Sequence, residues 1–198
     1  MEPLVQPIIV AEHEPHTHLE IVRDVASASL GCYLSQKGDE EGWNTWLTQQ
    51  DYRKTVRRLK RSMYDRLLEE TPEHYSYGAA TAFPPRLYAN FSRLMRRAQV
   101  RGVEFPRNET EQPQAENLIV LNDNLGMSTG KAAAQAAHAL WMLWDVVGGK
   151  TIPEFSLMPV SERFRHFEYS ATAEVIDKGL TEVSPSTVTA LVLKGGVF

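Results

Sequence analysis

Apolar residues near the start of the chain fall in short runs whose spacing changes from that of a strand to that of a helix. Leu4–Ala11 contains few polar residues and predicts a strand. Apolar residues then recur at helical spacing, so a helix is expected to open at His16-Thr17 and to stop at Gly31. The first segment therefore predicts one strand–helix unit.

The middle of the chain is predicted to be mainly helical. Trp43, Trp46 and Leu47 indicate one short apolar helical turn. In Tyr52–Leu68, apolar residues mark one face and basic residues the other, which predicts a longer amphipathic helix. The remaining expectations are a short strand at Ala79–Phe83, a helix at Leu87–Val100 and a linker at Phe105–Glu116.

The C-terminal part shows the clearest strand–loop–helix pattern. Asn117–Leu121 reads as a buried strand, Asn122–Gly130 as a loop and Lys131–Val147 as a strongly apolar helix. We expect Thr151–Phe167 to be irregular, with one short helix near Ser161–Phe167, followed by strands at Ala171–Ile176 and Thr187–Leu193. Helices that follow strands indicate an α/β fold: a layered mixed sheet of about four strands with helices on both faces, together with a helical basic insertion.

Composition narrows the function classes only a little. The 198 residues are 42% hydrophobic and 23% charged, with a net charge of −4, so a nucleic-acid partner would have to meet a local basic patch. A single cysteine, Cys32, excludes an internal disulfide framework and a cysteine-rich zinc site, and it fits a cytoplasmic protein. Met1–Pro15 lacks the basic start of a secretory signal, and no apolar run approaches the roughly 20 residues that span a bilayer. We therefore expect no membrane partner.

The loop Asn124–Lys131 carries candidate chemistry. Two glycines and a Ser-Thr pair precede Lys131 in the expected first turn of a helix, where free backbone N–H groups and an ammonium favour a phosphate or an oxyanion. A nucleotide-binding P-loop fits poorly, because Leu125 stands where its first glycine is needed and Ala132 replaces its hydroxyl residue.

A second polar segment, Asp177–Pro185, follows the expected strand at Ala171–Ile176. Thr181 lies four residues after Asp177, across a glycine turn that can bring the carboxylate and the hydroxyl together. A carboxylate beside a lysine stays ionised and can orient or deprotonate a water molecule.

Together the two segments resemble the archaeal and eukaryotic type of peptidyl-tRNA hydrolase, a family unrelated to the common bacterial enzyme. The run Met127–Ala139 is similar to that family's glycine- and lysine-containing helix start, and Asp177–Thr189 is similar to its later Asp-Ala-Gly-x-Thr segment. The resemblance implies that Lys131, Asp177 and Thr181 are catalytic, that peptidyl-tRNA is the substrate and that no cofactor is needed. It covers about 80 residues, and it departs from the family at Thr129, which replaces a loop lysine.

The resemblance also suggests an order of segments. The family places a further strand and helix between its two motifs, and the stretch from Thr151 to Ser170 is too short for both. We therefore expect a circularly permuted fold in which residues 1–31 supply this strand–helix unit of the core. Residues 32–116 would form a basic helical bridge and linker, and residues 117–198 would form the catalytic core.

Basic residues concentrate in the expected bridge. Six of the nine residues from Arg53 to Arg61 are Lys or Arg, and a second group of arginines follows. Such a concentration is typical either of a phosphate-backbone footprint or of a solvated helix face paired with acids. Beside a tRNA-ester site we favour tRNA binding, by Arg53, Lys54, Arg57, Arg58, Lys60, Arg61, Arg96 and Arg97.

Other residues leave alternatives open. His138 could face the same way as Lys131, but its apolar neighbours favour a hydrogen-bonded core histidine over a catalytic one. We expect no metal site, since the histidines at 13, 16 and 18 lack converging carboxylates or cysteines. The apolar residues Trp141, Met142 and Trp144 are expected in the core or on a homodimer surface.

Three functions are compatible with these motifs. The first is hydrolysis of the ester bond of peptidyl-tRNA in translation. The second is a catalytically weak or inactive relative that binds tRNA or a protein partner, which the loss of the loop lysine motivates. The third is a hydrolase of another ester or amide, with the same residues and a different substrate.

Overall fold

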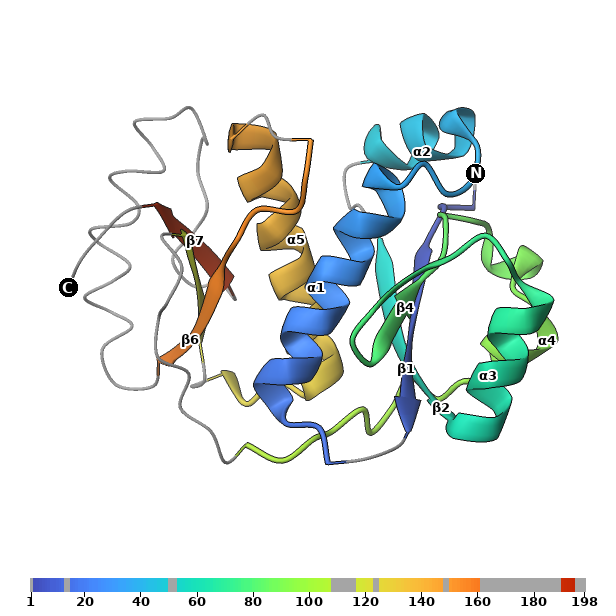
Figure 1. The fold of residues 1–198 in the computed structure, drawn as a ribbon, viewed down its shortest axis with the longest axis horizontal. Helices are drawn as coiled ribbons and strands as arrows, with labels where there is room; N and C mark the ends of the chain where they lie inside the picture. The colour runs from blue at the N-terminus through green and yellow to red at the C-terminus, as the bar shows by residue number, and fades with distance from the viewer. Residues whose placement is uncertain are drawn as a thin grey trace.

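The computed structural model describes residues 2–12, 15–49, 53–107, 117–122, 125–147, 150–160 and 190–194. These residues form two sheets with helices between them and on one outer side (Figure 1). The chain is thus an α/β protein with a four-stranded mixed sheet, as predicted, and it also has a separate three-stranded sheet that the sequence does not predict.

The first sheet is built around its most apolar strand. Its strands, in the order β2-β1-β4-β3, are β1 (Gln6–Glu12), β2 (Lys54–Lys60), β3 (Tyr75–Tyr77) and β4 (Ala80–Ala82). Strand β1 runs parallel to β2 and antiparallel to β4. Ile8 and Val10 enter one core cluster, and Ile9 and Ala11 enter another on the opposite face. Burial on both faces explains the continuous apolar run of β1.

Short helices cover the outer face of this sheet. They are α3 (Arg61–Glu70), the 3₁₀ turn η1 (Tyr88–Asn90) and α4 (Arg93–Arg97). Leu67 of α3 and Met95 of α4 are fully buried with Ile9 and Leu59 in a compact cluster. The outer layer therefore buries the second face of β1 and β2 (Figure 1).

The second sheet holds the C-terminal segment. It consists of β5 (Asn117–Asn122), β6 (Ser156–Val160) and β7 (Ala190–Lys194) in the order β6-β5-β7. Strand β5 is parallel to β6 and antiparallel to β7. The strand at β7 is predicted by the sequence, whereas β6 lies in a stretch predicted to be irregular. Its Pro159 is compatible with β6, which is an edge strand among the strands that the structure describes.

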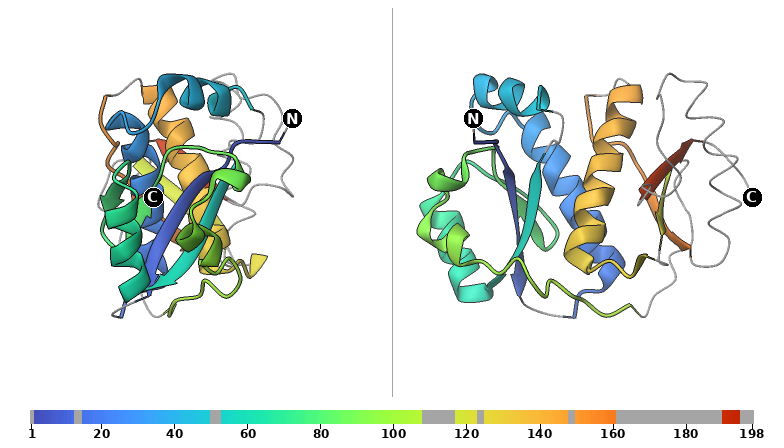
Figure 2. Two further views of the ribbon diagram at one scale, coloured as in Figure 1. Left: turned by 90° about the vertical axis from the view of Figure 1, so that its right-hand side faces the viewer. Right: turned by 180° about the vertical axis from the view of Figure 1, so that it is seen from behind.

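Two long helices lie between the sheets. They are α1 (His18–Leu34) and α5 (Thr129–Val147), which pack against each other, while the shorter α2 (Glu40–Leu47) follows α1. Figure 1 and the reverse view in Figure 2 both show α1 beside the first sheet and α5 beside the second. Helix α1 lies in the connection between the parallel strands β1 and β2, and helix α5 lies between the parallel strands β5 and β6. The described chain therefore contains two β–α–β units that meet through α1 and α5.

Buried hydrogen bonds join these units across the core. The Gln6 amide donates to the backbone oxygen of Ser29 at 3.0 Å and accepts from the Ser29 hydroxyl at 2.6 Å. The indole N–H of Trp141 donates to the same hydroxyl at 3.0 Å. Strand β1, helix α1 and helix α5 thereby share one polar network whose groups satisfy each other, as burial requires.

Helix α1 begins where the sequence predicts but continues beyond Gly31. A Cβ atom at Gly31 would lie 2.2 Å from a ring carbon of Tyr75. Glycine here therefore admits the ring of a neighbouring strand and does not mark a helix end.

The predicted helix at Tyr52–Leu68 is wrong in its first half. Residues Lys54–Lys60 form strand β2, and only the following residues are helical. Val56 lies in the cluster with α1 and α5, while Leu59 lies in the cluster on the opposite face, so the apolar residues serve two faces of a strand. The predicted helix at Leu87–Val100 is likewise reduced to η1 and α4.

The permuted order predicted for the core is also wrong in the described residues. Strand β1 lies in a different sheet from β5, because β2 and β4 already pair with both of its edges. In addition, the parallel partner of β5 is β6, which lies between Thr151 and Ser170. This is the stretch expected to be too short for a further strand and helix. The expected strand at Ala171–Ile176 and the expected short helix near Ser161–Phe167 lie outside the described residues.

We predict that Ser29→Ala lowers the free energy of unfolding by about 1–3 kcal/mol, since it leaves the buried Gln6 amide and Trp141 indole without their shared partner. Denaturant unfolding measures this change. A double variant, Gln6→Leu with Ser29→Ala, should lose less than the sum of the single variants, because both members of the polar pair are removed together. Strict additivity would contradict the network.

Candidate functional site

The loop that carries the first motif lies between β5 and α5, as predicted. Lys131 stands in the first turn of α5, and its side chain is exposed. Gly126 in the loop has a φ of +53°, a conformation that favours glycine. The end of a parallel strand next to a helix start is a usual position for a site in α/β proteins.

The second motif cannot be placed beside the first. Asp177 and Thr181 both lie outside the described residues. Their convergence with Lys131 therefore stays a prediction.

The backbone N–H groups at the start of α5 are already engaged. Thr129 N–H donates to Glu104 Oε2 at 3.4 Å, Gly130 N–H to the Val103 backbone oxygen at 3.1 Å, and Lys131 N–H to Ser128 Oγ at 3.3 Å. The expected open cradle for an oxyanion or phosphate is therefore wrong for these three groups. A carboxylate of the chain itself takes the favourable position at the helix N-terminus.

Thr129, which stands where the related family has a loop lysine, is fully buried. Its hydroxyl oxygen accepts from Phe105 N–H at 3.1 Å and lies 3.0 Å from His18 Nδ1. Because the oxygen accepts from Phe105, the hydroxyl hydrogen can be donated to the imidazole. A lysine would not fit this buried position without bringing a charge into it.

The segment Val103–Arg107 ties the starts of both long helices together. Besides the bonds to α5 given above, the backbone oxygen of Pro106 accepts from His18 N–H of α1 at 2.8 Å. The Arg107 guanidinium donates to the backbone oxygen of Met127, just before α5. Figure 1 shows this segment running beneath the lower ends of α1 and α5. The sequence indicates only a linker from Phe105 onward, so it gives no sign of the contribution of Glu104 and its neighbours.

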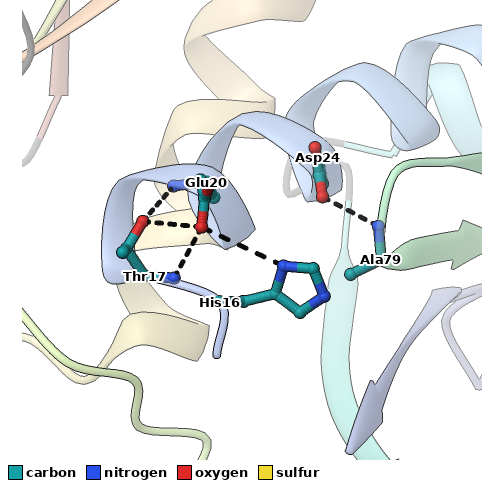
Figure 3. A network of polar contacts seen from close by, with 5 residues as sticks. All are labelled: His16, Thr17, Glu20, Asp24 and Ala79. Atoms are coloured by element: carbon teal, nitrogen blue, oxygen red, sulfur yellow. Dashed lines mark hydrogen bonds and ion pairs between the residues drawn. The ribbon is translucent and has the colours of Figure 1, made fainter. Parts of the chain in front are cut away.

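The start of α1 is also closed by its own side chains (Figure 3). Thr17 N–H donates to Glu20 Oε2 at 2.8 Å, and Glu20 N–H donates to the Thr17 hydroxyl, which forms a capping box. The bonds from the Thr17 backbone and hydroxyl lower the pKa of Glu20. His16 Nδ1 lies 4.0 Å from the same carboxylate.

Farther along α1, Asp24 fixes the turn between β3 and β4. Its carboxylate accepts from Ala79 N–H at 2.8 Å (Figure 3), and a Cβ atom at Gly78 would lie 2.2 Å from Asp24 Oδ2. Burial raises the pKa of Asp24, although the bond from Ala79 opposes this shift. Asp24 thus anchors the β3–β4 turn to α1.

Nothing in the described segments points to a metal centre. Among these residues, no three histidine, cysteine or acidic side chains gather closely enough to hold an ion. His18 is instead buried against Thr129, and His13 lies outside the described residues.

The basic residues of β2 do not share one face, which corrects the helical arrangement predicted for them. Arg57 is buried; its Nη1 donates to the backbone oxygens of Met95 and Ala98, each at 3.4 Å. Its guanidinium carbon lies 5.3 Å from the ring centroids of Tyr88 and Phe91. Arg57 therefore holds the end of α4 and is not available to a phosphate backbone.

The other predicted tRNA-binding residues differ in exposure. Arg58 is half-buried, with Nη2 3.4 Å from Gln99 Oε1 and 3.9 Å from Glu12 Oε1. Arg61 is exposed but pairs with Asp65 at 2.9 Å. Exposed side chains also remain at Arg53, Lys60, Arg96 and Arg97. Arg53 directly precedes β2 and Lys60 is its last residue, so roughly 20 Å of extended strand separates them.

Lys54 points inward, toward α5. Its Nζ lies 3.3 Å from His138 Nδ1, 4.8 Å from the centroid of the Trp46 ring and 5.7 Å from that of Trp141. Burial lowers the pKa of Lys54 to about 7. Burial, with a smaller effect from the Lys54 charge, lowers the pKa of His138 to about 4. His138 is therefore a half-buried, neutral histidine with a polar contact, which agrees with the core interpretation.

Of the three apolar residues late in α5, two pack into the core and one is exposed, and a homodimer surface stays a prediction. Trp141 is buried in the main core cluster, and Trp144 packs against it partly buried. Met142 has an exposed fraction of 44%.

Comparison with models of known protein families, with curated proteins and with solved structures finds no match for this chain. Within the described residues, no helix combines the length and the apolar character needed to cross a membrane. The case for a function therefore depends on the motifs and on the geometry above.

We predict that Thr129→Val lowers the free energy of unfolding by about 1–3 kcal/mol, because Phe105 N–H and His18 lose the hydroxyl between them. Equilibrium unfolding in denaturant measures this loss. Ser128→Ala is a matched control in the adjacent, less buried position and should change stability by less than about 1 kcal/mol. Equal effects would show that the Thr129 hydroxyl does not join the two helix starts.

Proposed function

We propose that this chain hydrolyses the ester bond that links the peptide to tRNA in peptidyl-tRNA. One observation carries the proposal beyond the sequence motifs: Lys131 presents an exposed ammonium in the first turn of α5, directly after the loop that follows β5. The motif thus occupies the strand–loop–helix position that suits such a site.

In the proposed reaction, a water oxygen attacks the ester carbonyl carbon. Asp177, assisted by the Thr181 hydroxyl, accepts the proton of the water and returns it to the ribose oxygen, which leaves as a hydroxyl when the tetrahedral intermediate collapses. Negative charge develops on the former carbonyl oxygen, and the Lys131 ammonium stabilises it. The Lys131 side chain has to supply this stabilisation, because the first N–H groups of α5 donate within the chain.

A non-catalytic relative that binds tRNA is the second candidate. The same occupied N–H groups favour it, as does the burial of Thr129 where the related family has a lysine. Such a protein would bind tRNA with steep salt dependence and would leave the ester intact.

We predict that Lys131→Ala and Asp177→Ala each reduce peptidyl-tRNA hydrolysis by at least about 100-fold, in line with the loss of a charge-stabilising donor or of a general base. Release of labelled peptide from peptidyl-tRNA, with excess enzyme, measures the rate. Lys150→Ala is the matched control, because Lys150 is also an exposed lysine near α5 but follows its other end. Wild-type rates in both site variants would refute the proposed activity, and tRNA binding without cleavage by the wild type would select the second candidate.

We predict further that Arg96→Ala with Arg97→Ala weakens tRNA binding and lowers the slope of log affinity against log salt by about one for each phosphate that is no longer bound. Both side chains are exposed on α4, so the fold should be retained. Arg57→Ala should instead destabilise the protein, since Arg57 is buried and binds the end of α4. Filter binding at several salt concentrations and thermal unfolding distinguish these effects. Unchanged affinity in the double variant would remove α4 from the tRNA interface.

A further inference from the structure

The amine of Lys54 lies within a cluster built by three elements. Helix α2 presents the Trp46 ring, helix α5 presents Trp141 and His138, and β2 carries Lys54 itself. On β1, the residue in register with Lys54 is Gln6, which binds Ser29 of α1. The amine therefore faces two indole rings and an imidazole.

Hydrogen bonds hold the two indole rings in place. Trp46 N–H donates to the Arg53 backbone oxygen at 3.0 Å, and Trp141 N–H donates to the Ser29 hydroxyl at 3.0 Å. Further rings surround the pair: Trp43 lies 5.6 Å from Trp46 and 6.0 Å from Trp141 between centroids. Tyr33 lies 5.1 Å from Trp141. Among the described residues, the groups around the amine are thus mostly aromatic, and hydrogen bonds position both indole rings.

These surroundings set the protonation state of both polar groups. The indole faces favour an ammonium, but burial disfavours it and lowers the pKa of Lys54 to about 7. About half of the Lys54 side chains are then neutral amines at pH 7. The pKa of His138, lowered to about 4, leaves its imidazole neutral and able to accept a proton at Nδ1.

A purely structural role explains less of this arrangement. A methionine or leucine would fill the space between the indole rings without a polar group to bury. Lys54 and His138 are also both partly exposed. Among the described strands, β2 is the last of its sheet, and its outer edge is paired at Arg58 with Gln99. The partial exposure of Lys54 and His138 gives a small molecule access to the side chains of this cluster.

We propose that Lys54 is a nucleophilic amine that condenses with small aldehydes, with His138 as its proton relay. The Nζ lone pair attacks the carbonyl carbon, and the proton released from nitrogen passes through His138 Nδ1 to the carbonyl oxygen, which gives a carbinolamine. Loss of water from the carbinolamine forms the imine. No electrons are transferred to or from an outside partner, and water reverses the reaction.

This centre is separate from the proposed ester-hydrolysis site. His138 follows Lys131 by seven residues, or about 10 Å along helix α5. The inference uses neither Lys131 nor Asp177, so the experiments that test it do not depend on whether the chain hydrolyses peptidyl-tRNA.

The test is reductive trapping on the full chain with formaldehyde and cyanoborohydride, followed by mass spectrometry of each lysine. At pH 7, Lys54 should react at least about tenfold faster than the exposed controls Lys60 and Lys150, because far more of its amine is neutral. Its rate should rise with pH to a midpoint near 7. Slower reaction than the controls, or a rate that rises only above about pH 9, overturns the proposal.

The relay is tested with His138→Phe. The Lys54 reaction should slow by at least about tenfold while its pH midpoint stays near 7, since a neutral imidazole contributes a proton path and not a charge. A wild-type rate in this variant overturns the role given to His138.

A second measurement uses stability and needs no aldehyde. The pKa of Lys54 falls from its ordinary 10.5 to about 7 on folding, so the unfolded chain binds more protons between these two pH values. The wild type should therefore gain stability relative to Lys54→Met as the pH rises from 7 toward 10.5, and denaturant unfolding at several pH values measures the difference. A difference that does not change with pH overturns the neutral amine on which the proposal depends.

Discussion

The contact between α1 and α5 determines the rest of this structure. Each helix belongs to a separate β–α–β unit, and each unit leaves an apolar helix that must be covered. Small buried residues occur on both helices, including Ala26 and Ser29 of α1 and Ala133 and Ala137 of α5. The two helices pack against each other, and the main core cluster extends from β1 across them to β5. One core therefore serves both sheets.

This packing also fixes the surroundings of the proposed hydrolase site. Because α1 and α5 begin at the same end of the molecule, the segment Val103–Arg107 can bind both helix starts at once. Thr129 is buried at this junction and binds His18 across it. The start of α5 thus depends on residues of the N-terminal unit, although the motif itself is local in sequence.

The local pattern of apolar residues predicts the long elements, whereas the positions of the shorter strands depend on how they pair with distant strands. Strand β1 and helices α1 and α5 are predictable because their apolar spacing is determined by burial within single elements. Strand β2 has the pattern of a helix, because its apolar residues serve opposite faces of a sheet and continue into α3. Strand β6 escapes prediction, because a short edge strand with a proline has little local signal. Of the site, the loop and Lys131 are predictable, but the bonds of the Thr129 and Gly130 N–H groups depend on Glu104 and Val103, which lie far from the motif in sequence.

The basic run shows how far residue type alone can mislead about function. On a helix its members would have formed one cationic face, whereas on β2 alternation sends Arg57 and Lys54 to opposite sides of the sheet. Arg57 becomes a cap for the end of α4, and Lys54 becomes an amine between indole rings. The charge that a tRNA could meet is therefore reduced to the exposed residues around them. Burial also lowers the pKa of Lys54 to about 7, so its ammonium is far more easily deprotonated than that of an exposed lysine.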